Sequence, residues 1–322
     1  MVLSTQNLHL GNANVNQRFE HGMVSPAYKT YDIIGCSVDL IAQWIKSDAA
    51  KRFFYNATTV GASVCRRNVE WDTLYEQSLY LPCRDEQEKV AKFLALLSNR
   101  INKQQQFVAA LKKYKRGVIQ HIFRHSFAQG NTEWTCVRLG DVFKKVSRRN
   151  TNGMVKNVIT NSAEYGLVPQ REFFEKDIAV DGNTANYYVI EEGDYVYNPR
   201  KSNTAPYGPF NRYSLSEKGI ISPLYTCLVL QADIYPSYLA WYFKSDAWHR
   251  YIYDNGSQGV RHDRVSMTDD LLMGIPVMFP DRTRQLIYAE MLDKIEKRLQ
   301  AAQKEYELLV SMKVGCVQQL FI

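Results

Sequence analysis

The feature that most constrains this chain is a heptad stripe within residues 85–123. Apolar side chains recur there at alternating spacings of four and three residues, and only Gln104 and Lys115 interrupt the pattern. The apolar stripe positions are Val90, Leu94, Leu97, Ile101, Val108, Leu111, Val118 and Ile122. This spacing is typical of a coiled-coil helix. Without proline and with one glycine, the segment can remain helical for about 39 residues, or about 60 Å at 1.5 Å per residue. Such a helix needs a partner for its stripe.

The partner is predicted in the same chain. Adding 198 to each stripe position leads to residues 281–321, where the pattern repeats and the polar interruption at Lys115 recurs as Lys313. The same offset runs without a gap from residue 41 to residue 123 and gives 23 identities in 83 positions. The sequence therefore contains an internal repeat, and each copy ends in a long helix.

Composition favours a soluble globular protein. The 322 residues are 45% hydrophobic and 23% charged, which is enough apolar material for two or more domains with proper cores. No apolar run is long enough for a membrane span, and the N-terminal sequence does not have the pattern of a secretion signal. The six cysteines form no CxxC pair and the six histidines no metal-spaced cluster. We therefore expect reduced thiols, a cytoplasmic location, no membrane association and no metal site.

The charge balance favours a polyanionic partner. Forty Lys and Arg against 33 Asp and Glu give a net charge of +7. Four of the basic residues, Lys144, Lys145, Arg148 and Arg149, cluster near the start of the central region, and Arg200 and Lys201 are neighbours in a loop-like stretch. The alternative is that these residues belong to ordinary solvated faces.

The secondary structure expected ahead of the first long helix is irregular and short. The segments are a loosely structured stretch at 1–23, a strand at 23–34, an amphipathic helix at 39–54, a loop at 56–68 and a short strand at 78–81. The central region should form short strands at 155–160, 187–190 and 194–197, a surface loop at 198–211, a strand at 220–230, a helix at 236–253 and a loop at 254–264. The 77 residues 134–210 have no sequence counterpart ahead of the first half-domain, so the first copy is expected to be incomplete.

Several motifs of this chain resemble those of one family. The second copy opens at Trp134 with W-x-x-V-x-LGDVF, and Gly193-Asp194 precedes a Pro/Gly loop. Both copies carry Gly and Arg five residues apart, as Gly61 and Arg66 and as Gly259 and Arg264, and end in a K-x-G-x-x-Q-x-x-F helix. The helix follows a P-x-x-x-EQ turn in the first copy, with Arg284-Gln285 in place of Glu-Gln in the second. These motifs and the duplication resemble the specificity subunit of Type I restriction-modification systems.

The resemblance implies an α+β fold in which target recognition domains are separated by two long antiparallel coiled-coil helices. Each domain would read half of a bipartite site in double-stranded DNA. Methyltransferase (modification) subunits would dock on the helix ends, and motor-nuclease (restriction) subunits would join that core. The expected boundaries are a partial first recognition domain at 1–82, a spacer helix at 83–125, a linker at 126–133, a complete second recognition domain at 134–280 and a second spacer helix at 281–322.

We find no sequence pattern for catalysis. A glycine-rich cofactor loop after a strand, paired metal carboxylates and a nucleophile with an obvious base are all missing. The segment Asn198-Pro199-Arg200 is similar to the NPPY of amino-methyltransferases, but its third and fourth residues differ, so we interpret it as a loop. We therefore expect no catalytic residue, no cofactor and no metal ligand.

Two loops hold the candidate DNA contacts. Arginine can form paired hydrogen bonds with guanine and Gln or Asn with adenine, whereas Lys and Ser more often hold phosphate. The candidates are Arg200, Lys201, Ser202, Asn203, Tyr207, Ser257, Gln258, Arg261, His262 and Arg264. The alternative is that they are ordinary loop residues. Arg264 recurs as Arg66 in a domain that would read another sequence, which favours a phosphate or structural role for it.

We interpret the aromatic pair Tyr187-Tyr188 and the run 241–243 as core residues rather than base-stacking platforms.

The alternative functions of the chain are a structural or assembly module, or a silent truncated cassette, without sequence-specific DNA binding. A self-contained methyltransferase or nuclease is disfavoured by the missing motifs.

Overall fold

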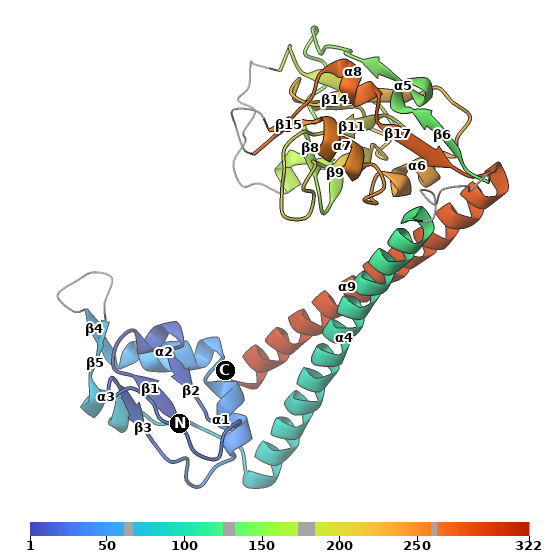
Figure 1. Ribbon diagram of the computed structural model, residues 1–322. Coiled ribbons are helices and arrows are strands. Elements are labelled where there is room, and N and C mark those ends of the chain that lie inside the picture. Colours follow the sequence, from blue (N-terminus) through green and yellow to red (C-terminus); the bar gives the residue numbers. More distant parts are fainter. Residues whose placement is uncertain (61–66, 125–132, 173–183, 259–262, 322) are drawn as a thin grey trace. The chain divides into compact units, whose positions relative to one another are not determined.

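The computed structural model describes residues 1–60, 67–124, 133–172, 184–258 and 263–321. Its contacts divide the chain into a first unit, Met1–Ala110 with Leu299–Ile322, and a second unit, Leu111–Arg298. Two long helices, α4 (Arg84–Arg124) and α9 (Arg282–Leu320), contribute to both units (Figure 1). Each unit therefore contains the beginning of one long helix and the end of the other.

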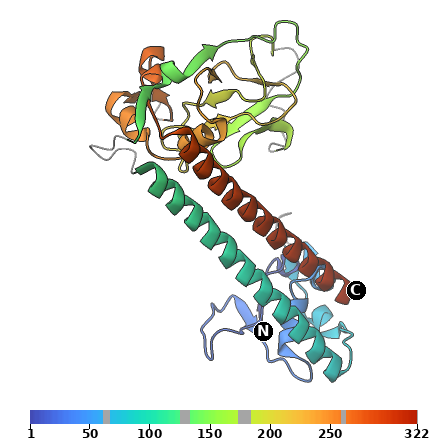
Figure 2. The same ribbon diagram turned by 90° about the vertical axis from the view of Figure 1, so that its right-hand side faces the viewer.

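The heptad stripe is the seam between α4 and α9. All ten stripe positions of α4, Gln104 and Lys115 included, are buried or half-buried. Gln104 Nε2 donates to the Ala302 carbonyl and to Glu305 Oε2, both at 3.0 Å. In the second unit Lys115 Nζ lies 2.7 Å from Glu296 Oε2. The polar interruptions thus find partners across the seam, and the prediction of two long antiparallel helices that pack together is confirmed (Figure 2).

The second unit is built on a four-stranded antiparallel sheet with the order β12-β11-β14-β7. Its strands are β7 (Phe143–Val146), β11 (Tyr195–Tyr197), β12 (Phe210–Arg212) and β14 (Thr226–Leu230). Aromatic rings fill the space between this sheet and the helices, with Phe210 and Phe243 stacked at 3.9 Å between ring centroids. These rings belong to the largest apolar core of the chain.

Four antiparallel strand pairs and several short helices complete the second unit. The pairs are β6 (Thr135–Arg138) with β17 (Pro276–Phe279), β8 (Ile159–Ser162) with β9 (Gly166–Pro169), β10 (Tyr188–Ile190) with β13 (Gly219–Ile221), and β15 (Ser257–Gln258) with β16 (Val265–Ser266). The helices are α5 (Leu139–Val142), η3 (Gln170–Glu172), α6 (Pro236–Tyr242), α7 (His249–Asn255) and α8 (Asp269–Met273).

The first unit is a reduced version of the second. Its three-stranded sheet has the order β2-β1-β3, with β1 (Val2–Ser4), β2 (Ala13–Asn14) and β3 (Tyr28–Thr30). The other elements are η1 (Leu8–Leu10), α1 (Val38–Trp44), α2 (Asp48–Asn56), β4 (Thr58–Val60), β5 (Arg67–Val69) and α3 (Trp71–Glu76). Leu3, Leu8, Trp44 and Phe54 lie in its core.

The structural repeat reaches further toward the N-terminus than the sequence repeat. Val2 pairs with Asn14 as Val196 pairs with Asn211, so β2-β1-β3 reproduces β12-β11-β14. The expectation of a loosely structured stretch at 1–23 was therefore wrong for residues 1–14, whereas residues 15–23 form no helix or strand. Strands of two or three residues are too short to produce a detectable alternation, and pairing with distant segments stabilises them. The part of the second unit without a counterpart in the first is residues 134–194, a shorter segment than the sequence indicated.

Identical residues anchor both long helices. Gln87 Oε1 accepts from the Ser37 backbone N–H at 2.8 Å, and Gln285 Oε1 accepts from the Tyr235 N–H at the same distance. Each glutamine also donates to the carbonyl of the preceding proline, Pro82 at 2.9 Å or Pro280 at 2.8 Å. At the other ends, Phe123 belongs to the core of the second unit and Phe321 packs on the core of the first. The repeated motifs thus join each helix to a unit at both of its ends.

Other sequence expectations were wrong in detail. The helices expected at 39–54 and 236–253 are each two helices. In the first unit Ser47 ends the pattern because it caps α2 by accepting from the Ala50 N–H at 3.1 Å. In the second unit the chain breaks at the equivalent place, between α6 and α7. The loop expected at 56–68 includes β4 and β5, and the one at 254–264 includes β15. The strand expected at 220–230 is two strands, β13 and β14, with a turn between them. Within the strand expected at 23–34 only β3 is a strand, and of the strand expected at 155–160 only the end, where β8 starts at Ile159, is one.

The strand expected at 78–81 is also absent from the structure. Its counterpart β17 is a strand because it pairs with β6. No described segment of the first unit takes the place of β6, so residues 78–81 lack a pairing partner.

Candidate nucleic-acid interface

The loop that follows β11 has a fixed base. The Asn198 N–H donates to the Pro209 carbonyl at 3.0 Å, and the Tyr197 hydroxyl donates to the Tyr207 carbonyl at 2.8 Å. Gly208 has φ +85°, and a Cβ atom on it would lie 2.0 Å from the Asn198 carbonyl oxygen. Only glycine combines this backbone conformation with so close an approach. The two ends of the loop are therefore clamped together.

Three buried asparagines connect this loop to the β8–β9 hairpin. Asn211 Nδ2 donates to Asn161 Oδ1 at 2.7 Å, and Asn161 Nδ2 donates to the Val196 carbonyl at 2.9 Å. Asn198 Nδ2 donates to the Asn161 carbonyl at 3.4 Å. Sequence analysis missed this cluster, because the asparagines are 13 or more residues apart and only the fold brings them together.

The structure brings the two predicted contact loops together. The Lys201 N–H donates to the Asp263 carbonyl at 2.8 Å, and the Val265 N–H donates to the Pro199 carbonyl at 2.9 Å. Arg200 and Arg264 form an isolated antiparallel bridge between these hydrogen bonds. Arg200 and Lys201 therefore lie beside Arg264.

A cleft of about 320 Å³ opens beside the first loop. Arg200, Lys201 and Ser202 line one part of it, and Ser162 and Glu164 from the β8–β9 turn line another. The Arg200 side chain is 67% exposed and lies 3.8 Å from the Asp263 carboxylate, which is a loose ion pair. Its guanidinium is thus held near the cleft while its hydrogen-bonding groups stay accessible.

The remaining candidates lie in different environments. Asn203 is exposed, whereas Tyr207 is half-buried and its ring centroid lies 4.9 Å from that of His249. Ser257 and Gln258 are in β15, and Arg261 and His262 lie outside the described residues. Arg264 is half-buried, and its Nε is buried without a hydrogen-bond partner among the described residues. This burial favours the structural or phosphate role over base contact for Arg264.

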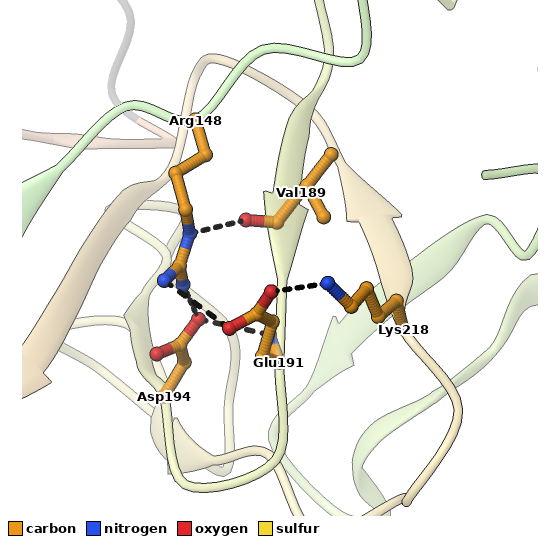
Figure 3. A network of polar contacts seen from close by, with 5 residues as sticks. All are labelled: Arg148, Val189, Glu191, Asp194 and Lys218. Atoms are coloured by element: carbon orange, nitrogen blue, oxygen red, sulfur yellow. Dashed lines mark hydrogen bonds and ion pairs between the residues drawn. The ribbon is translucent and has the colours of Figure 1, made fainter. Parts of the chain in front are cut away.

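Part of the basic cluster at 144–149 is occupied by ion pairs (Figure 3). Arg148 pairs with the buried Asp194 and, at 3.5 Å, with Glu191, whose other oxygen lies 2.7 Å from Lys218 Nζ. The hydrogen bond from Lys218 lowers the pKa of Glu191, and burial raises the pKa of Asp194. Lys145 pairs with Asp269 at 2.6 Å. Arg148 and Lys145 thus have carboxylate partners within the second unit, and Lys144, Lys145 and Arg149 are exposed.

The same network explains the Gly-Asp motif. Gly193 has φ +94°, and Asp194 Oδ2 accepts from the Glu191 N–H at 2.9 Å, which closes the turn before β11. The pairing of Asp194 with Arg148 then ties this turn to the segment that follows β7. The motif is therefore a structural device of the second unit.

The interpretation of the aromatic run as core is confirmed. Trp241, Tyr242 and Phe243 are at most 4% exposed and belong to the main core. Among the described residues, no group of three or more His, Cys, Asp and Glu side chains could hold a metal ion. In the same part of the chain, no helix is long and apolar enough to span a membrane.

Comparison with solved structures finds related folds, whereas no protein-family model and no curated protein matches the chain. The HsdS subunit of Thermoanaerobacter tengcongensis is 16% identical, with a TM-score of 0.51 over 89% of this chain and 70% of that chain. A chain from the structure that describes complex assembly and conformational transition of the type I R-M system is also 16% identical, with a TM-score of 0.53 over 89% of this chain and 71% of that chain. The chain therefore has the fold of the specificity subunits of type I restriction-modification systems.

Proposed function

We propose that this protein is a DNA sequence-specificity subunit of a type I restriction-modification complex, and that its second unit binds one half-site of a bipartite target in double-stranded DNA. The observation that carries the proposal is the likeness of 89% of the chain to an HsdS subunit. In this function the chain is not itself an enzyme. It selects the DNA sequence, and methyltransferase and motor-nuclease subunits carry out the chemistry.

The geometry of the cleft supports DNA contact by the loop at 200–206. Arg200 presents a planar group with several donors that suits the two acceptors on the major-groove edge of guanine. Its pairing with Asp263 at 3.8 Å is loose and solvent-exposed, so it contributes little energy and DNA can displace it. Lys201 and Ser202 beside it are the residue types that commonly hold phosphate. Glu164, which also lines the cleft, would repel phosphate nearby and favour the amino groups of cytosine or adenine.

The long helices supply surfaces for protein subunits. Outside the seam, α4 exposes Phe93 by 49% and Leu96 by 60%, and α9 exposes Leu308 by 61% and Met312 by 48%. The two members of each pair lie three or four residues apart on one helix face, and contiguous exposed apolar patches are typical of surfaces that bind other proteins. We assign them to contact with the methyltransferase subunits, which the motor-nuclease subunits then join.

The test of DNA recognition is the Arg200→Ala variant of the full chain. The DNA is the sequence that the unchanged chain selects from a random double-stranded pool. Losing a paired contact with guanine should weaken binding to this selected DNA about 5- to 150-fold at fixed salt, with a smaller effect on unrelated DNA. The control is Lys294→Ala, which removes the same charge from an exposed position of α9. Equal affinities of Arg200→Ala and Lys294→Ala for the selected DNA would contradict the assignment.

Footprinting separates this function from the alternative of an assembly module. The specificity subunit protects a short defined sequence, whereas an assembly module binds the methyltransferase subunits and protects none. The expected result is a footprint that moves with the sequence when the site is relocated in the DNA fragment.

A further inference from the structure

One segment of the second unit contributes to two sheets and to the core. β6 pairs with β17, α5 follows, and β7 then pairs with β14 at the edge of the main sheet. Leu139, Val142 and Phe143 from this segment are at most 2% exposed. The segment 135–146 is therefore a strand–helix–strand closure that covers two strand edges and fills the core between them.

In the first unit, the strand edge that corresponds to the β7-paired edge of β14 has no described partner strand. β3 is the counterpart of β14, but it has only one neighbour among the described strands, namely β1. Tyr31 exchanges two backbone hydrogen bonds with Met1, at 2.8 and 2.6 Å. In an antiparallel pair these bonds alternate along the strand, so the backbone groups of Thr30 and Asp32 point to the opposite edge. That edge is free for another strand.

The first unit also has the edge that β6 would cover. Residues 78–81 are the counterpart of β17 and are unpaired. Leu79 is 36% exposed where its counterpart Val277 is fully buried, and Tyr80 is 93% exposed where Met278 is 8% exposed. The sequence Ser-Leu-Tyr-Leu has the residues of a strand, and it lacks only the partner that β17 has.

A cavity of about 350 Å³ lies between these two open segments. Its apolar walls include Ile33, next to the free edge of β3, and Leu79 of the unpaired segment. The cavity is also lined by Ile41, Trp44 and Leu74. Their counterparts in the second unit are Leu239, Tyr242 and Leu272. These belong to the same core as the closure residues Leu139, Val142 and Phe143. The cavity thus lies where the second unit places the apolar side chains of its closure segment.

We propose that the first unit binds, in trans, a strand–helix–strand segment of another polypeptide with the sequence character of residues 134–146. One strand of this segment would add to β3, the other would pair with residues 78–81, and its Leu, Val and Phe side chains would fill the cavity. Strand addition supplies main-chain hydrogen bonds, and the cavity supplies specificity for the apolar side chains. This binding site exists whether or not the second unit reads DNA.

The experiment uses the full chain and a synthetic peptide of residues 134–146 with Cys136→Ser, followed by amide hydrogen exchange. The expected result is slower exchange at residues 30–33 and 78–81, by about tenfold when nine tenths of the sites are occupied. The control peptide carries Leu139→Asp and Phe143→Asp and should leave exchange unchanged. In the protein, Leu79→Asp should abolish the effect of the peptide, whereas Leu215→Asp, at an equally exposed leucine of the second unit, should not.

A tethered version removes the dependence on peptide affinity. Joining residues 134–146 to Met1 through a flexible Gly/Ser linker raises the effective concentration of the segment to about the millimolar range. The fusion should raise the thermal midpoint of the first unit and slow exchange at the same two segments, and the fusion with the two Asp substitutions should do neither. No protection from the peptide or from the tether, or equal protection by native and Asp-substituted segments, would overturn the proposal.

Discussion

Single residues decide how the interface loop is held. Gly208 and Asn161 make no contact that composition or periodicity predicts, yet one closes the loop and the other joins it to the β8–β9 hairpin. Their effect is structural, so their substitution should be visible in stability as well as in DNA binding.

Gly208→Ala tests the loop clamp, with Gly153→Ala as a matched control. Both glycines have positive φ, so both substitutions carry a backbone cost of about 1–2 kcal/mol. Only Gly208 faces a carbonyl oxygen where its Cβ would lie, whereas Gly153 faces open space. Gly208→Ala should therefore reduce the free energy of unfolding of the second unit by about 1–3 kcal/mol more than Gly153→Ala, as measured by urea denaturation. Equal losses would contradict the clamp.

Asn161→Ala tests the asparagine cluster. The change removes two buried hydrogen bonds, the one from Asn211 Nδ2 to Asn161 Oδ1 and the one from Asn161 Nδ2 to the Val196 carbonyl, while Asn211 Nδ2 keeps its bond to the Ser162 carbonyl at 3.1 Å. The expected cost is about 1–3 kcal/mol of unfolding free energy. Asn203→Ala, at an exposed position of the same loop, should change stability by less than about 0.5 kcal/mol. A loss for Asn161→Ala as small as that for Asn203→Ala would mean that the cluster does not hold the loop.

At the scale of elements, the α4–α9 seam is the feature with the clearest energetic consequence. Leu94 is fully buried, and Leu96, two residues further along the same helix, is 60% exposed. Leu94→Ala should reduce the free energy of unfolding of the first unit by about 2–5 kcal/mol, because it leaves a cavity in the packed core. Leu96→Ala should change it by less than about 0.5 kcal/mol, since its side chain is already in water. Urea denaturation followed by circular dichroism measures both, and similar losses would contradict the seam.

The elements also show what the sequence could predict. A heptad pattern repeats over many turns, so the two long helices were evident from local spacing alone. Strands β1, β2 and β3 have two or three residues each and exist because distant segments pair, which local patterns do not report. The break after α1 was missed because Ser47 caps a new helix inside an otherwise helical pattern.

The candidate site was predictable in the same limited sense. Arg200, Lys201 and Ser202 were identified by residue type in a Pro/Gly loop, and the structure places them on one cleft. Their proximity to Asp263 and Arg264 follows from backbone hydrogen bonds between segments about 60 residues apart. The spacing of residues along the sequence gives no indication of such contacts.

At the scale of the whole molecule, one repeat organises both units. Gln87 and Gln285 make the same pair of hydrogen bonds, and Phe123 and Phe321 end the two long helices against the cores of the second and the first unit. The cleft with Arg200 belongs to the second unit. The account therefore predicts that the second unit recognises the DNA sequence.

The measurement that tests this account most directly is selection of DNA from a random double-stranded pool by the full chain at fixed salt. The account predicts that one short contiguous motif is enriched, and that the enrichment is lost in Arg200→Ala and kept in Lys294→Ala. Retention of DNA without any enriched motif, or a motif that Arg200→Ala selects as well as the unchanged chain does, would contradict it.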